Sequence, residues 1–352
     1  MAEKYECITI ADLTLQSKEV LSRPRVVCSV NGTPNPDGSN VIVICHALTG
    51  SHHVTGAPSP GLPDAWWEDV VGPGRAIDTD RFCVVCCCNL CSPYGSSAPT
   101  DIDPATGRPI GMSFPVISPR DVARSQRAAL NALGINRIAG VVGGSLGGMI
   151  ALEWAASFPD TMDFCVAIAA PALMYPQAAA FNIVQRRSIT TDPDWKDGDY
   201  YPDRGPMNGL SNARMLAMIT YRSEESFINR RATAQNGEVE GYLMYHGEEI
   251  TRRFDANCYL HLTRMMDLHD ISDGRGDIEA AFEGFRGNGK RFLAVGINSD
   301  ILFPAWQVRE LFDAAVDAGV NASYREIKSD VGHDAFLVET ERMSEILREF
   351  LG

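Results

Sequence analysis

Three features are scarce in this sequence: positive charge, long apolar runs and metal-ligand patterns. Lysine and arginine number 31 against 45 aspartate and glutamate residues, which gives a formal net charge of −14 over 352 residues. Because nucleic acids and anionic membranes are themselves negative, this balance disfavours both as the main partner. No apolar stretch approaches the roughly 20 residues of a membrane-spanning helix, so we expect no membrane insertion.

The sequence also shows no recognisable targeting signal. The first residues do not place a basic segment before an apolar core, so we expect no secretory signal peptide. The last residues, 348–352, match no retention or peroxisomal tail. These features predict a cytoplasmic protein.

Metal-binding patterns are incomplete. Among ten cysteines, Cys88 and Cys91 have zinc-ligand spacing, but no second cysteine or histidine pair follows at a suitable distance. Cys45, Cys86 and Cys165 lie in apolar strand-like runs, where cysteine behaves as a small buried hydrophobe. We therefore predict reduced, structural cysteines and no metal site.

The composition is that of a protein with a large core. Hydrophobic residues make up 45% of the chain and charged residues 22%, and the length suits one α/β domain with an insertion, or two domains. Strand-like runs alternate with helix-like segments such as 119–133. The expected strands of the first half span residues 25–30, 41–45, 82–88, 137–142 and 163–169. This alternation predicts a mostly parallel sheet with helices on both faces.

The alternation breaks after Pro171. The following residues show helical periodicity and few strand signals, with helices expected at 178–189, 209–221 and 255–269. Strand–helix order resumes later, at 291–297, 306–318, 323–327 and 335–350. We predict an α/β core in two parts, residues 1–171 and 285–352, separated by a helical lid insertion, residues 172–284.

A candidate nucleophile lies in the first part of this core. Residues 143–147 read Gly-Gly-Ser-Leu-Gly, between the apolar run 138–142 and the helix-like run 149–156. Strand, Gly-x-Ser-x-Gly and helix in that order are typical of a nucleophile elbow, a tight turn that strains the serine and directs a helix N-terminus at its hydroxyl. A chain with 31 glycines can produce the pentapeptide by accident, but the flanking elements favour Ser145 as a nucleophile.

A serine nucleophile needs a base, which in this type of fold follows it in the sequence at the end of a later strand. His333 follows the expected strand 323–327 and comes directly after Gly332, which permits a tight turn. The rival histidines all lie in the expected insertion: His246, His261 and His269. We predict His333 as the base.

The base needs an acid to orient it. Asp300 follows the expected strand 291–297, where this type of fold carries the acid. Asp330 competes because it is only three residues from His333. We predict Asp300, with Asp330 as the alternative.

An oxyanion hole needs two backbone N–H groups. One is expected from Leu146, directly after the nucleophile, and the other from the loop after strand 41–45, where Leu48 is the candidate. His46, in the same loop, precedes the serine in the sequence, so we expect it to be a packed, hydrogen-bonded structural residue.

Several segments along the chain form a recognisable set: Cys45 to His52, Gly72 to Asp80, Asn89 to Pro99, Asp103 to Pro109, Gly143 to Gly148 with Leu152 to Trp154, Asp197 to Tyr201, Phe254 to Tyr259, Asn298 to Asp300 and Gly332 to Leu337. Through these segments the chain resembles the homoserine O-acetyltransferase family of α/β-hydrolase-fold acyltransferases over roughly residues 40–345. The resemblance implies the α/β-hydrolase fold, with a mostly parallel central sheet and a helical lid.

The resemblance also implies a reaction. Ser145 would take an acetyl group from acetyl-CoA, used as a co-substrate with no permanently bound cofactor, and pass it to a hydroxyl acceptor. His333 would act as base and acid in both steps. Arg214 and Tyr221, two helical turns apart, would face the acceptor, with the arginine on its carboxylate, and Asp334 would meet its ammonium. Without the resemblance, Arg214 and Tyr221 read as a solvated helix face.

Two segments depart from the family pattern. The first, Cys28 to Gly32, stands where members usually carry a Tyr-x-Thr-x-Gly-like strand. The second, the loop Leu90 to Ser97, lacks the usual glycine-rich run and is similar to that of fungal members, including deacetylcephalosporin C acetyltransferase. The acceptor expected is therefore homoserine or a related amino-acid or secondary-metabolite alcohol. The alternatives are a serine hydrolase with the same triad and a non-catalytic scaffold. By analogy with the family, we expect a homodimer packed through the helical lid.

Overall fold

The computed structural model describes residues 4–229, 237–287 and 289–352, and its central feature is an eight-stranded sheet of order β1-β4-β8-β5-β9-β10-β11-β12. The strands from β8 to β12 in this order run parallel, whereas β4 runs antiparallel to both of its neighbours. The strands are β1 (Lys4–Thr9), β4 (Arg25–Asn31), β5 (Val41–Cys45), β8 (Cys83–Cys87), β9 (Gly140–Gly144), β10 (Phe164–Ile168), β11 (Arg291–Ile297) and β12 (Asn321–Ile327). Two further two-stranded sheets pair β2 (Leu13–Thr14) with β3 (Val20–Leu21) and β6 (Val71–Gly72) with β7 (Ile77–Asp78).

Both faces of the sheet are covered. Side chains alternate along a strand, so in β5 Val41 and Val43 join one apolar cluster while Ile42 joins a second. Helices α1 (Pro119–Ala132), α2 (Leu146–Ser157) and α9 (Ala305–Asp317) contribute to the first cluster, and α11 (Thr340–Leu351) to the second. This burial on both sides explains why β5 is apolar at every position.

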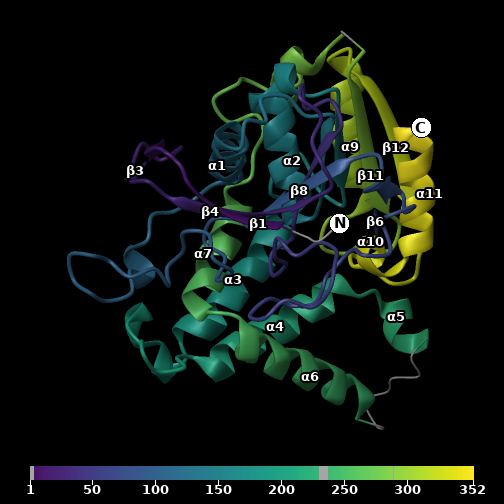
Figure 1. Cartoon of the computed structure of the whole chain (residues 1–352). Coiled ribbons are helices and arrows are strands. Elements are labelled where there is room, and N and C mark those ends of the chain that lie inside the picture. The colour runs from purple at the N-terminus through teal and green to yellow at the C-terminus, as the bar shows by residue number, and fades with distance from the viewer. Residues whose placement is uncertain (1–3, 230–236, 288) are drawn as a thin grey trace.

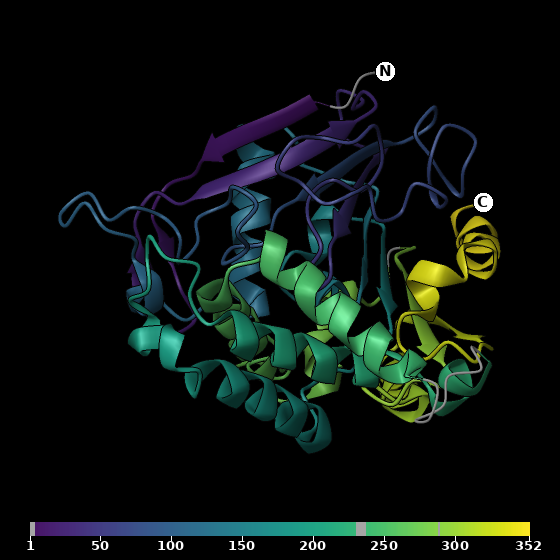
Figure 2. The same cartoon turned by 90° about the horizontal axis from the view of Figure 1, so that it is seen from below.

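The predicted helical insertion follows β10. Its helices are α3 (Pro176–Thr190), α4 (Met207–Tyr221), α5 (Glu224–Asn229), α6 (Glu238–Arg253) and α7 (Ala256–Asp267), and α8 (Ile278–Ala281) leads back to the sheet. Figure 1 shows α3, α4 and α6 together on one side of the sheet, and Figure 2 shows them from below. The predicted fold class, a mostly parallel sheet with a helical insertion, is confirmed. The boundaries at residues 171 and 284 stay a prediction, because the insertion shares one apolar cluster with the core.

Two predicted elements need correction. The strand expected at 137–142 lies at Gly140–Gly144 and so runs directly into Ser145. Glycine allows this close packing, because a Cβ at Gly140 would come within 2.3 Å of the Phe164 ring. The helix expected at 335–350 is broken after Val338 into α10 (Ala335–Val338) and α11. In the described part of the chain no helix is both long and apolar enough to span a membrane.

Candidate active site

The turn between β9 and α2 holds Ser145 in a strained conformation, with φ 58° and ψ −126°. Such a positive φ is rare for a residue with a side chain. The glycines on either side are required by space: a Cβ at Gly143 would lie 2.0 Å from the Gly147 carbonyl oxygen, and one at Gly147 would lie 2.0 Å from the Cys45 carbonyl oxygen. The turn therefore presses the start of α2 against the end of β5.

The structure brings Ser145, His333 and Asp300 into one hydrogen-bonded chain. The Ser145 hydroxyl lies 2.8 Å from His333 Nε2, and His333 Nδ1 lies 2.6 Å from Asp300 Oδ2. A carboxylate can only accept, so Nδ1 carries the proton and Nε2 is left to accept from the serine. The other Asp300 oxygen accepts from the backbone N–H groups of Leu302 and Phe303 at 2.8 and 3.0 Å. This arrangement can deprotonate the serine as it attacks an acyl carbon.

The surroundings of His333 tune its basicity. Burial opposes protonation of the ring, but the charge and hydrogen bond of Asp300, aided by Asp334, outweigh it and raise the pKa of His333 above its usual 6.5. All three groups of the chain are buried, with Ser145 the most exposed at 6%. A buried base with a raised pKa holds a proton firmly enough to return it to a leaving group.

The rival residues lie elsewhere. Asp330 is exposed and accepts from Asn229 on α5 at 3.5 Å. His261 packs edge-on against Phe114, and His269 bonds the Pro171 carbonyl at 2.8 Å. His246 lies on α6 against two tyrosine rings.

The loop after β5 presents Leu48 to the same cavity as Ser145. The His46 ring holds this loop: its Nε2 accepts the Asn89 backbone N–H at 2.9 Å, so Nδ1 carries the proton and donates to the Ala47 carbonyl at 2.9 Å. Burial lowers the pKa of His46 to about 4 and keeps the ring neutral. His46 is thus the packed, hydrogen-bonded residue expected from the sequence. The Leu146 side chain is buried in the core, and its N–H begins α2.

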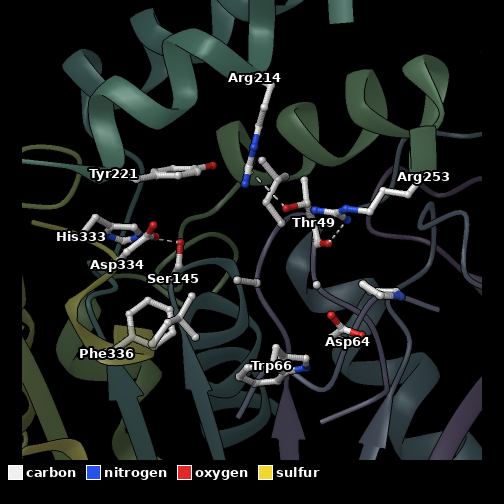
Figure 3. Close-up of a pocket in the computed structure, with 15 residues that line it drawn as sticks. Thr49, Asp64, Trp66, Ser145, Arg214, Tyr221, Arg253, His333, Asp334 and Phe336 are labelled. Carbon is white, nitrogen blue, oxygen red and sulfur yellow. Dashed lines mark hydrogen bonds between the residues drawn. The ribbon is translucent and has the colours of Figure 1, made fainter. Parts of the chain in front are cut away.

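A cavity of about 210 Å³ opens over Ser145 (Figure 3). It is lined by the segment after β5, by the turn at Ser145, by the insertion and by the residues that follow β12: Ala47, Leu48, Thr49, Gly50, Pro63, Asp64, Trp66, Ser145, Arg214, Tyr221, Arg253, His333, Asp334, Phe336 and Leu337. The volume suits small substrates or the reacting ends of larger ones. All the side chains expected to contact the acceptor reach this space.

Arg214 and Tyr221, both on α4, lie together above the serine. The Arg214 guanidinium stands 5.5 Å from the centre of the Tyr221 ring, and its Nη1 donates to the Thr49 hydroxyl at 3.4 Å. Arg214 Nε is buried without a hydrogen-bond partner. A buried donor with no partner is costly, and a bound carboxylate would satisfy it. The Tyr221 ring lies 5.7 Å from that of His333, and burial raises its pKa to about 12.

Asp334 also lines the cavity but already has a cationic neighbour. Arg222 Nη2 lies 3.6 Å from its carboxylate. Burial raises the pKa of Asp334, with Arg222 and His333 acting in the opposite direction. Neither Arg222 nor the cavity-lining Arg253 was predicted from the sequence. Arg222 directly follows Tyr221, which was expected to contact the acceptor. This adjacency in the sequence could have pointed to Arg222.

The cysteines lie in the buried runs expected from the sequence. All ten cysteines lie in the described part of the chain and are free thiols, and nine of them are buried. Within residues 4–229, 237–287 and 289–352, no group of three or more histidine, cysteine, aspartate or glutamate side chains is arranged to hold a metal ion. The Cys88 and Cys91 pair is part of the apolar core.

Comparison with known proteins gives consistent matches. A family model described as alpha/beta hydrolase fold matches residues 40–340. A homoserine O-acetyltransferase of Symbiobacterium thermophilum is 45% identical over 96% of this chain and 91% of that protein. The crystal structure of homoserine O-acetyltransferase from Bacillus anthracis superposes with a TM-score of 0.92 at 27% identity, over 100% of this chain and 98% of that one. Esterase E22, with a TM-score of 0.90 and 24% identity over 99% of this chain and 100% of that one, shares the fold.

Proposed function

This chain belongs to the homoserine O-acetyltransferase family of the α/β-hydrolase fold, and we propose from that premise that it transfers an acetyl group from acetyl-CoA to the hydroxyl of homoserine. The observation that carries the proposal is the shared cavity. Ser145 and His333, which form a hydrogen-bonded chain with Asp300, line the same small space as Arg214, whose Nε has no partner. Acyl chemistry and a receptor for a carboxylate are therefore adjacent.

The first half-reaction loads the enzyme. Ser145 Oγ attacks the thioester carbonyl carbon while its proton passes to His333 Nε2. The N–H groups of Leu48 and Leu146 stabilise the oxyanion that forms. The carbon–sulfur bond then breaks, and CoA leaves as a thiol with the proton from His333. Asp300 stabilises the imidazolium in between.

The second half-reaction transfers the acetyl group. The guanidinium of Arg214 binds the acceptor carboxylate through its planar fork, Tyr221 packs beside it, and Asp334 meets the ammonium. His333 removes the proton of the acceptor hydroxyl, whose oxygen attacks the acetyl-enzyme. Ser145 leaves with a proton from His333, which restores the free enzyme. No prosthetic group is needed for any step.

The identity of the acceptor is the most specific part of the proposal. None of the residues 90–97, where the chain departs from the family pattern, is among those that line the described cavity. Identity of 45% with a homoserine O-acetyltransferase further supports homoserine over a secondary-metabolite alcohol. We accordingly place the activity in methionine biosynthesis, with the cytoplasm as its expected location.

One mixing experiment tests this function. With acetyl-CoA alone, the intact protein should gain about 42 Da on Ser145, and homoserine should clear the adduct with formation of O-acetylhomoserine. Ser145→Ala should show no adduct, and Arg214→Met should load normally but clear slowly at a given homoserine concentration. A secondary-metabolite alcohol, deacetylcephalosporin C, is tested in parallel as acceptor.

Two outcomes would contradict it. An adduct that clears equally fast in water without acceptor identifies a serine hydrolase. A protein that forms no adduct and turns over no thioester or ester has no catalytic role.

We further propose that two chains associate through the insertion. Helices α3 and α6 carry exposed apolar side chains, among them Ile183, Val184 and Tyr245, at 58%, 53% and 64% exposure. Burial of such side chains is the usual source of dimer stability.

A further inference from the structure

Arg253, at the C-terminal end of α6, connects the insertion to the loop that carries Leu48. We propose that Arg253 is a positioning residue: it holds the main chain of the loop 46–50 in the conformation in which the Leu48 N–H points at the reacting oxygen. This role rests on the proposed acyl-transfer function. It assigns to a residue of the lid a part in building the oxyanion hole.

The contacts of Arg253 are directed at the backbone of this loop. Its Nη1 donates to the Thr49 carbonyl oxygen at 3.0 Å and to the Tyr94 hydroxyl at 2.7 Å. Its Nε donates to Glu249, one turn earlier on α6, at 2.7 Å. Three acceptors thus fix the guanidinium plane, which is the geometry that an arginine fork provides and an ammonium does not.

The site of contact determines what the arginine can do. The Thr49 carbonyl and the Gly50 N–H form one peptide unit, and the Gly50 N–H donates to the Ala47 carbonyl at 3.1 Å. The Ala47 carbonyl belongs to the same peptide unit as the Leu48 N–H, and it also accepts from His46 Nδ1 at 2.9 Å. Because peptide units are planar, Arg253 orients the Gly50 N–H through the Thr49 carbonyl, and the Gly50 N–H in turn holds the unit that carries the Leu48 N–H.

Arg214 does not duplicate this contact. Figure 3 shows Arg214 and Arg253 approaching Thr49 from different helices. Arg214 reaches the Thr49 side chain at 3.4 Å, a long contact that the acceptor carboxylate would compete for. Arg253 bonds the main chain and has its Nε already paired with Glu249. Of these two arginines, Arg253 is therefore the one that can hold the loop throughout the reaction cycle.

Tyr94 extends the connection to the second segment that departs from the family pattern. Its ring is buried and packs edge-on against Phe254, with centroids 5.8 Å apart. Burial raises the pKa of the Tyr94 hydroxyl, so the group stays neutral and can accept from Arg253. The loop 90–97 thus acts on the cavity through Arg253 and not by lining it.

The test compares Arg253→Met with a matched control on the same helix, Arg252→Met. Arg252 also pairs one turn back, with Glu248, but is 69% exposed. We expect Arg253→Met to slow both acylation and transfer by about 10- to 100-fold, as when an oxyanion donor is misplaced, with the homoserine KM within about 3-fold of wild type because Arg214 is untouched. Arg252→Met should leave both steps unchanged.

Two milder variants distinguish a loss of positioning from a folding defect in Arg253→Met. Arg253→Lys keeps the charge but can serve fewer of the three acceptors, so it should recover part of the rate. Tyr94→Phe keeps the ring and removes one acceptor, so it should lose less than Arg253→Met. Affinity for an acetyl-CoA analogue bearing a trifluoromethyl ketone, which mimics the oxyanion, should weaken in parallel with the rate.

The readouts separate this proposal from the proposed function. Acylation is followed with 4-nitrophenyl acetate, whose burst needs neither acetyl-CoA nor homoserine, so it reports on the oxyanion hole in a transferase and a hydrolase alike. If Arg253→Met raises the KM for homoserine and leaves the burst rate unchanged, Arg253 binds substrate, and the positioning role is overturned. Equal losses in Arg253→Met and Arg252→Met, or undiminished affinity for the ketone, would also overturn it.

Discussion

At the scale of single residues, we expect the protonation of His333 to govern the pH dependence of acylation. The ring must be neutral to take a proton from Ser145, and Asp300 raises its pKa above 6.5. The rate of acylation should therefore fall as the pH drops through a midpoint above 6.5. We expect Asp300→Asn to lower that midpoint, because burial of the ring is then opposed by Asp334 without the charge of Asp300, and to reduce the rate by up to about 10⁴-fold. Burst rates with 4-nitrophenyl acetate between pH 5 and 9 measure both effects.

The control for this prediction is the rival carboxylate. Asp330→Asn should leave the profile unchanged, since its side chain is exposed and bonds Asn229. A midpoint that shifts in Asp330→Asn and stays in Asp300→Asn would contradict the assignment of the acid.

Some residues of the candidate site can be predicted from the sequence and others cannot. Ser145, Asp300 and His333 could be chosen because each follows a recognisable strand, and the order of strands predicts which loops meet. Arg253 could not, because its partner Thr49 is 204 positions away and no motif links the two. Only the path of α6 across the cavity brings them together.

At the scale of elements, α2 carries one buried acid in an apolar helix. Residues 146–155 are all buried. Glu153 among them is flanked by Arg120 at 3.1 Å and Arg275 at 2.7 Å. These pairs join α2 to α1 and to the segment between α7 and α8 in the insertion.

We expect Glu153→Gln to lower the free energy of unfolding by about 3 kcal/mol, because two guanidinium groups lose their shared counter-charge in a buried site. Urea unfolding followed by circular dichroism measures the change. The matched control is Glu349→Gln, which breaks the exposed pair with Arg325 and should not move the midpoint. Equal shifts in the two variants would refute the argument.

Elements also differ in how well the sequence predicts them. The strands 41–45 and 291–297 have the predicted bounds because they are apolar runs between polar residues. β1 was not predicted, since this edge strand exposes most of its residues and lacks an apolar face. The break between α10 and α11 after Val338 could not be predicted, because no glycine or proline lies at that point in the sequence.

At the scale of the whole molecule, the proposed dimer can be tested directly. Size-exclusion chromatography with light scattering should give a mass of about twice the 38.4 kDa chain. The double variant Val184→Glu and Tyr245→Glu should yield monomers, because charge on both helices opposes burial. Val316→Glu, on α9 and 46% exposed, is the control and should stay dimeric. A wild-type monomer would disprove association.

The contact of Gly147 with the Cys45 carbonyl has a mechanical consequence. With no free space between the start of α2 and the end of β5, neither element can slide against the other. Ser145, the proposed nucleophile, directly precedes α2, and Leu48, the proposed backbone donor, lies in the loop that follows β5. This packing would keep the spacing of the two groups constant while the acyl group arrives and departs.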